Sequence, residues 1–91
     1  MSCMSPHVSL ARRDHMRLVW QEPYHGVERV RVLLWTCDCR ATVYELCQAG
    51  GQTFLRRTLR FEKERQVHET YRWTFAQAYE IWVALLCGAA R

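Results

Sequence analysis

Cysteine is the residue type that offers the most chemistry in this chain. Of five cysteines, Cys37, Cys39 and Cys47 lie close together in the sequence. With His25 or His68 they could supply four ligands to zinc, which binds thiolate and imidazole groups. Structural zinc ligands are usually paired with about two to four residues between them, whereas one residue separates Cys37 from Cys39. The spacing therefore favours free thiols that are buried or lie at the edge of the core, with a zinc site as an alternative.

The other residues that could support catalysis do not form a recognisable active site. No glycine-rich loop leads from an expected strand into a helix, so no nucleotide phosphate site is indicated. No close pair of carboxylates lies among apolar residues. A cysteine nucleophile would need His25 or His68 as its base, and the sequence around these histidines does not favour that role. We therefore predict a protein that is not an enzyme and has no cofactor, apart from the alternative of zinc.

Most of the elements that would position these side chains are short strands. Segments rich in β-branched and aromatic residues alternate with brief loops, and connections of about two or three residues make neighbouring strands antiparallel. The expected strands span residues 14–21, 30–37, 42–48, 53–61 and 66–73.

The hydrophobic period changes after Thr74, a residue type typical of helix N-caps. Apolar residues then recur at helical spacing until Gly88, which favours a helix end. Such a helix needs an apolar surface, and the sheet provides one. We predict an α+β fold: an antiparallel four- to five-stranded meander with one C-terminal amphipathic helix packed on one face. Residues 14–91 form this single domain, and residues 1–13 form a flexible N-terminal arm.

The glycines at 50 and 51 predict the register of one hairpin. A two-residue turn there places Leu46 opposite Leu55 and Glu45 opposite Arg56. These pairs put leucines on one face and a pair of opposite charges on the other.

Three-residue loops in the two flanking hairpins would place Leu34 opposite Tyr44 and Leu59 opposite Val67. With this register, one face of the sheet forms the core beneath the helix. Its expected members are Val30, Val32, Leu34, Tyr44, Leu46, Leu55, Leu59, Phe61, Val67, Tyr71 and Trp73.

The opposite face combines apolar and cationic side chains, which is unusual for a face that only contacts solvent. Its candidate binding residues are Arg31, Leu33, Trp35, Phe54, Arg56, Arg60, His68 and Arg72.

Three interpretations of this face remain open. In the first, either the segment containing Met16, Leu18 and Trp20 or the N-terminal arm covers the apolar patch within the chain, and the arginines contact solvent. In the second, the patch is a homodimer or protein-partner interface, where tryptophan and arginine are common anchors. In the third, Trp35 and Phe54 stack on the bases of a single-stranded nucleic acid while the arginines contact its phosphates.

Composition limits the partners without choosing one. The net charge of +4 permits a polyanionic partner, and no apolar run is long enough to cross a membrane. The first residues do not resemble an export signal, which favours a cytoplasmic location. Arginine supplies twelve of the thirteen basic residues and asparagine is absent, a bias typical of GC-rich bacterial genomes. We therefore predict a small non-enzymatic regulatory module that binds itself or a protein partner, with single-stranded nucleic-acid binding and zinc binding as alternatives.

Overall fold

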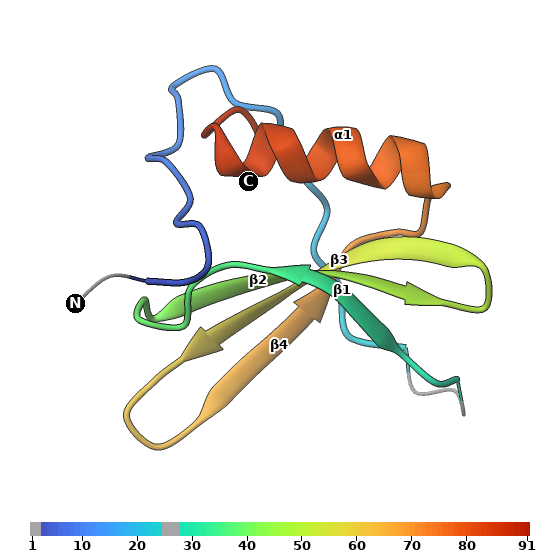
Figure 1. Cartoon of the computed structure of the whole chain (residues 1–91). Helices are drawn as coiled ribbons and strands as arrows, with labels where there is room; N and C mark the ends of the chain where they lie inside the picture. The colour runs from blue at the N-terminus through green and yellow to red at the C-terminus, as the bar shows by residue number, and fades with distance from the viewer. Residues whose placement is uncertain (1–2, 25–27) are drawn as a thin grey trace.

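The structure, a computed structural model, describes residues 3–24 and 28–91. Within these residues, four antiparallel strands form one sheet in the order β1-β2-β3-β4, and the C-terminal helix α1 lies over one face (Figure 1). This arrangement confirms the predicted α+β fold. The elements are β1 (Arg31–Trp35), β2 (Thr42–Ala49), β3 (Gln52–Arg60), β4 (Arg65–Glu69) and α1 (Phe75–Leu86).

Helix α1 begins at the predicted residue and covers the predicted side of the sheet. The hydroxyl of Thr74 accepts a hydrogen bond from the backbone of Gln77, whose side chain in turn caps the backbone of Thr74. Ala78, Trp82 and Leu85 are buried against a sheet surface formed by Tyr44, Leu46 and Leu55. No helix in the described part of the chain has both the length and the apolar character needed to span a bilayer.

The N-terminal segment runs beside the C-terminal end of α1 (Figure 1). The backbone N–H of Ser9 donates to the carbonyl of Leu86, and that of Arg12 donates to the carbonyl of Gly88. Gly88 has a φ of 81°, and a methyl group on it would overlap the carbonyl oxygen of Leu10. Glycine at this position therefore allows the helix to end with a positive φ and allows the N-terminal segment to approach closely. The expected flexibility of residues 1–13 stays a prediction.

Residues 14–21 do not form the further strand that the alternation suggested. They make isolated bridges, in which Met16 pairs with Ala90 and Gln21 pairs with Glu69. Leu18 and Trp20 pack against the core beneath α1. These two side chains therefore do not cover the opposite face, which was one of the two forms of the first interpretation.

The β2–β3 register is confirmed. Gly50 and Gly51 both have positive φ and form the tight turn, and Leu46 pairs with Leu55. Alternation then places leucines on the helix side and the residues next to them on the other side. We call the face opposite α1 the open face.

The expected β3–β4 register is wrong by one residue. Val67 pairs with Thr58 instead of Leu59, because the connecting loop contains four residues. The backbone N–H of Phe61 donates to Glu64 within this loop, so Phe61 does not extend the strand. Because side chains alternate along a strand, the shift turns His68 to the helix side, opposite Arg57, and Val67 to the open face.

The expected β1–β2 register is also wrong. A β-bulge between Val32 and Leu34 pairs Val32 with Cys47 and Leu34 with Leu46. The position opposite Tyr44 belongs to Thr36, whose hydroxyl accepts a hydrogen bond from the backbone of Tyr44.

These shifts change the membership of the core. Tyr44, Leu46 and Leu55 are buried as predicted, and Trp73 packs against them. Leu59 and Val67 are half-buried. Several other predicted core residues are exposed, with exposed fractions between 36% and 56%: Val30, Val32, Leu34, Phe61 and Tyr71.

Candidate metal centre

Two of the arginines predicted to bind a partner on the open face form ion pairs within the chain. The Nε atom of Arg56 lies 2.9 Å from Oε1 of Glu45. The Nη1 atom of Arg72 lies 2.8 Å from Oε1 of Glu28. Each guanidinium is therefore largely neutralised within the molecule, which weakens the case for a cationic strip that follows phosphates.

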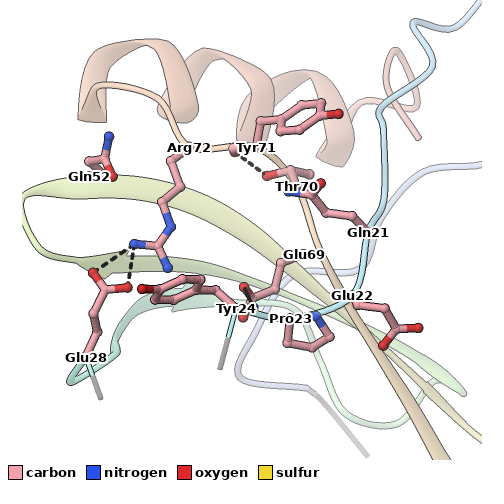
Figure 2. Close-up of a pocket in the computed structure, with 10 residues that line it drawn as sticks. All are labelled: Gln21, Glu22, Pro23, Tyr24, Glu28, Gln52, Glu69, Thr70, Tyr71 and Arg72. Carbon is pink, nitrogen blue, oxygen red and sulfur yellow. Dashed lines mark hydrogen bonds and ion pairs between the residues drawn. The ribbon is translucent and has the colours of Figure 1, made fainter. Parts of the chain in front are cut away.

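Phe54 is fully buried, contrary to the expected exposed patch. The guanidinium of Arg72 lies 4.9 Å from the centre of the Phe54 ring and 5.3 Å from that of Tyr24. Figure 2 shows Arg72 extending towards the carboxylate of Glu28 and the ring of Tyr24. Arg72 and Tyr24 line a shallow pocket of about 700 Å³. Glu22, Glu28 and Glu69 also line this pocket, so its charge disfavours a phosphate.

The remaining candidates are dispersed. Trp35 is 54% exposed on the open face, where it pairs with Glu45. Arg31 pairs with Gln48 on the helix side, and Leu33 lies in the bulge. His68 is on the helix side of β4. The sheet therefore does not bring Trp35 and Phe54 together as two exposed stacking surfaces.

Thiol and imidazole groups gather instead beside the loop between β1 and β2. Cys37 and Cys39 belong to this loop, while Cys3 and His7 come from the N-terminal segment. The backbone N–H of Cys37 donates a 2.8 Å hydrogen bond to the carbonyl of Pro6, which fixes the segment next to the loop. Two stretches distant in the sequence thus place four potential metal ligands at one point.

The distances within this cluster suit a metal ion. The ligand atoms of Cys3, His7, Cys37 and Cys39 all lie within 4.8 Å of one another, close enough to hold one ion. The sulfurs of Cys3 and Cys39 are 3.7 Å apart. Two thiolates bound to one zinc at about 2.3 Å and at the tetrahedral angle would be separated by about 3.8 Å. Nε2 of His7 is 3.1 Å from Sγ of Cys39, so a few tenths of an ångström of movement would admit the ion.

Hydrogen bonds within the cluster shift the pKa values of two of its three thiols in opposite directions. The backbone N–H of Cys39, followed by the side chains of Cys3, Cys39 and His7, lowers the pKa of Cys37 to about 7. Hydrogen bonds with the sulfurs of Cys37 and Cys39 raise the pKa of Cys3 to about 12. Cys37 is also the buried member, with 7% of its surface exposed. The surroundings of Cys37 thus favour the thiolate form, which is the form that binds metals.

Arg60 supports the loop that carries two of these cysteines. Its guanidinium donates hydrogen bonds to the backbone carbonyls of Asp38 and Arg40, on either side of Cys39. The sequence indicated Arg60 as a partner-binding residue, but the structure gives its guanidinium these contacts within the chain. It acts here as a positioning residue for the cluster.

Comparisons of this chain with protein-family models, curated proteins and solved structures gave no match. The chemistry of the cluster therefore rests on its own geometry and donor types.

Two of the three cysteines suggested as metal ligands lie in the cluster. The third, Cys47, is fully buried beside Ala49 and Phe54, and burial raises the pKa of its thiol to about 12. His25 lies outside the described residues. Sequence reasoning missed Cys3 and His7, although their separation by three residues is a spacing common among zinc ligands.

Proposed function

We propose that this chain is a small zinc-binding module in which one ion is held by Cys3, His7, Cys37 and Cys39. The supporting observation is that all four ligand atoms lie within 4.8 Å of one another. Three thiols and one imidazole form a donor set that suits zinc better than magnesium or calcium, which prefer oxygen ligands.

The proposed role of the ion is structural. Four protein ligands complete the tetrahedral coordination that zinc prefers, so no position is left for a reactive water molecule. This feature supports the prediction that the protein is not an enzyme. The ion would join the N-terminal segment to the β1–β2 loop at the end of the sheet, in addition to the hydrogen bond between Cys37 and Pro6.

The predicted role as a non-enzymatic interaction module is compatible with such a site. A structural ion can stabilise a domain that is too small to bury a large core. The prediction of single-stranded nucleic-acid binding receives less support, because Phe54 is buried and both Arg56 and Arg72 are paired with glutamates.

Metal content tests the proposal. We expect protein purified without chelator to contain one zinc per chain by elemental analysis. Cys39→Ser should abolish stoichiometric zinc, whereas Cys87→Ser, at an exposed cysteine outside the cluster, should retain it. Zinc retained at full occupancy in Cys39→Ser, or an intact protein that takes up no zinc when the ion is added, would overturn the proposal.

A further inference from the structure

Strand β1 lies at one edge of the sheet and differs in character from the strand at the other edge. Three apolar side chains of β1 are more than a third exposed, as is that of Val30 just before the strand. Their exposed fractions are 38% for Val30, 36% for Val32, 41% for Leu34 and 54% for Trp35. Such an exposed edge with a single charged residue, Arg31, is unusual, because edge strands of monomeric proteins are generally protected by several charged residues, proline or another segment.

The opposite edge, β4, is protected by charged residues and by another segment of the chain. Its sequence contains Arg65, Gln66, His68 and Glu69. Gln21 also pairs with Glu69 from outside, because each of their backbone N–H groups donates to the carbonyl of the other at 2.9 Å. A further strand could not add there without displacing this bridge.

The outer edge of β1 has no comparable cover. Among residues 3–24 and 28–91, no backbone hydrogen bond reaches Arg31–Trp35 from any element other than β2. Among the described residues, the backbone hydrogen bond of the N-terminal segment on this side lies beyond the strand, where Pro6 accepts from Cys37, while Met4 and Ser5 line a pocket together with Trp35. The outward backbone groups of β1 are therefore available to a pairing strand.

We propose that β1 pairs antiparallel with β1 of a second copy of this chain. Two four-stranded sheets would then join into one sheet of eight strands, related by a two-fold axis perpendicular to the sheet. This symmetry keeps the faces continuous, so both α1 helices lie on one side and both Trp35 side chains on the other. The proposal does not depend on the zinc site.

The faces set by the bulge limit the registers available to this interface. Val32 and Trp35 are both on the open face, since they pair with Cys47 and Glu45 of β2. Residues that oppose each other in a ladder share a face. Among the registers that meet this condition, we propose the one that places Val32 opposite Trp35 of the second copy, because aliphatic–aromatic pairs stabilise antiparallel sheets.

The charge distribution of β1 favours a second copy of this chain as the occupant. Arg31 is the one charged residue in the strand. In the register above, Arg31 lies opposite Thr36 of the second copy, so the two arginines are several residues apart along the joined strands. Self-pairing thus buries apolar side chains without placing like charges against each other.

Analytical ultracentrifugation of the zinc-supplemented full chain and of a metal-free sample, over about 1 µM to 1 mM, tests the proposal. We expect a reversible monomer–dimer equilibrium. Val32→Lys should shift it to monomer, because an edge lysine opposes strand pairing. Val67→Lys, the matched change on the open face of β4, should leave the dimer intact. A wild-type monomer throughout this range, or a dimer unaffected by Val32→Lys, would overturn the proposal, whatever the zinc content.

Hydrogen exchange of the wild-type protein supplies a test that does not depend on a variant folding. Amide protection in Arg31–Trp35 should fall on dilution while protection in β4 stays constant. Concentration-dependent protection in the exposed face of α1, around Phe75 and Tyr79, would place the interface elsewhere and overturn the proposal.

Discussion

The guanidinium of Arg60 donates a 2.6 Å hydrogen bond to the backbone carbonyl of Arg40, the residue that follows Cys39. A second hydrogen bond from the same guanidinium reaches the carbonyl of Asp38. Strand β3 thereby restrains the loop on which the proposed zinc site depends. This relationship connects an open-face arginine to the proposed zinc site through the loop backbone.

Replacing Arg60 should therefore weaken zinc binding without removing a ligand. We expect Arg60→Gln to lower the zinc affinity by about 10- to 100-fold, the usual effect of losing a group that orients metal ligands. Competition with a chromophoric chelator measures this change. Arg65→Gln, at an exposed residue of the β3–β4 hairpin, is the control and should bind zinc as the wild type does. Equal affinities for the two variants would contradict the role given to Arg60.

The close approach of the N-terminal segment to Gly88 can be tested by comparing two glycines. Gly51 and Gly88 have similar positive φ values of 76° and 81°, so alanine should strain the backbone at both positions by about 1–2 kcal/mol. A methyl group meets no atom within 4 Å at Gly51, whereas at Gly88 it overlaps the Leu10 carbonyl. Urea unfolding should show a larger loss for Gly88→Ala. Equal losses would mean that the segment is not held at this position.

The corrected core predicts different effects for two residues that the sequence had placed together. Leu55 is fully buried beneath α1, whereas Phe61 is 52% exposed in a loop. We expect Leu55→Ala to reduce the free energy of unfolding by about 2–5 kcal/mol, the typical effect of a cavity in a core. Phe61→Ala should cost less than about 1 kcal/mol. Chemical denaturation distinguishes them, and a large effect at Phe61 would favour the register expected from the sequence.

The buried thiol of Cys47 should make stability depend on alkaline pH. Burial raises its pKa to about 12 in the folded protein, from 9.0 in the unfolded chain. The folded state therefore keeps the proton that the unfolded state loses. This contribution to stability is fully present below pH 9 and is lost as the pH rises from there to about 12.

We expect wild-type protein to lose up to about 1 kcal/mol per pH unit relative to Cys47→Val in this window, by urea unfolding. The valine variant retains the apolar packing beside Phe54 and has no titrating group at this position. Parallel stability curves for the two proteins would show that Cys47 is not held as a buried thiol.

The sequence predicted correctly those parts of the fold in which the turn residues and the alternation of apolar side chains indicated the same register. The glycine pair at 50 and 51 allows one tight turn, and alternation then aligns Leu46 with Leu55. In the last hairpin, Phe61 was equally acceptable in a strand or a loop, and one extra loop residue inverts a face. The bulge after Val32 likewise had no local signature, because every neighbouring residue favours a strand.

Two of the four residues of the proposed zinc site were predicted from the sequence, and two were missed, for a related reason. Cys37 and Cys39 attracted attention by their spacing, but the N-terminal residues lacked any periodicity and were assigned to an arm. Only the folded chain brings Cys3 and His7 to the β1–β2 loop, through contacts with Cys37 and with the end of α1. A site assembled from separate segments depends on tertiary structure that a sequence pattern does not contain.

Zinc K-edge X-ray absorption of the purified protein tests the central proposal most directly, because it reports the ligands of the bound ion. We expect three sulfurs at about 2.3 Å and one nitrogen at about 2.0–2.1 Å. Cys3→Ser should remove one sulfur from this set, and His7→Gln should remove the nitrogen. A spectrum dominated by oxygen or nitrogen ligands, or one unchanged in both variants, would contradict the assignment of the ion to Cys3, His7, Cys37 and Cys39.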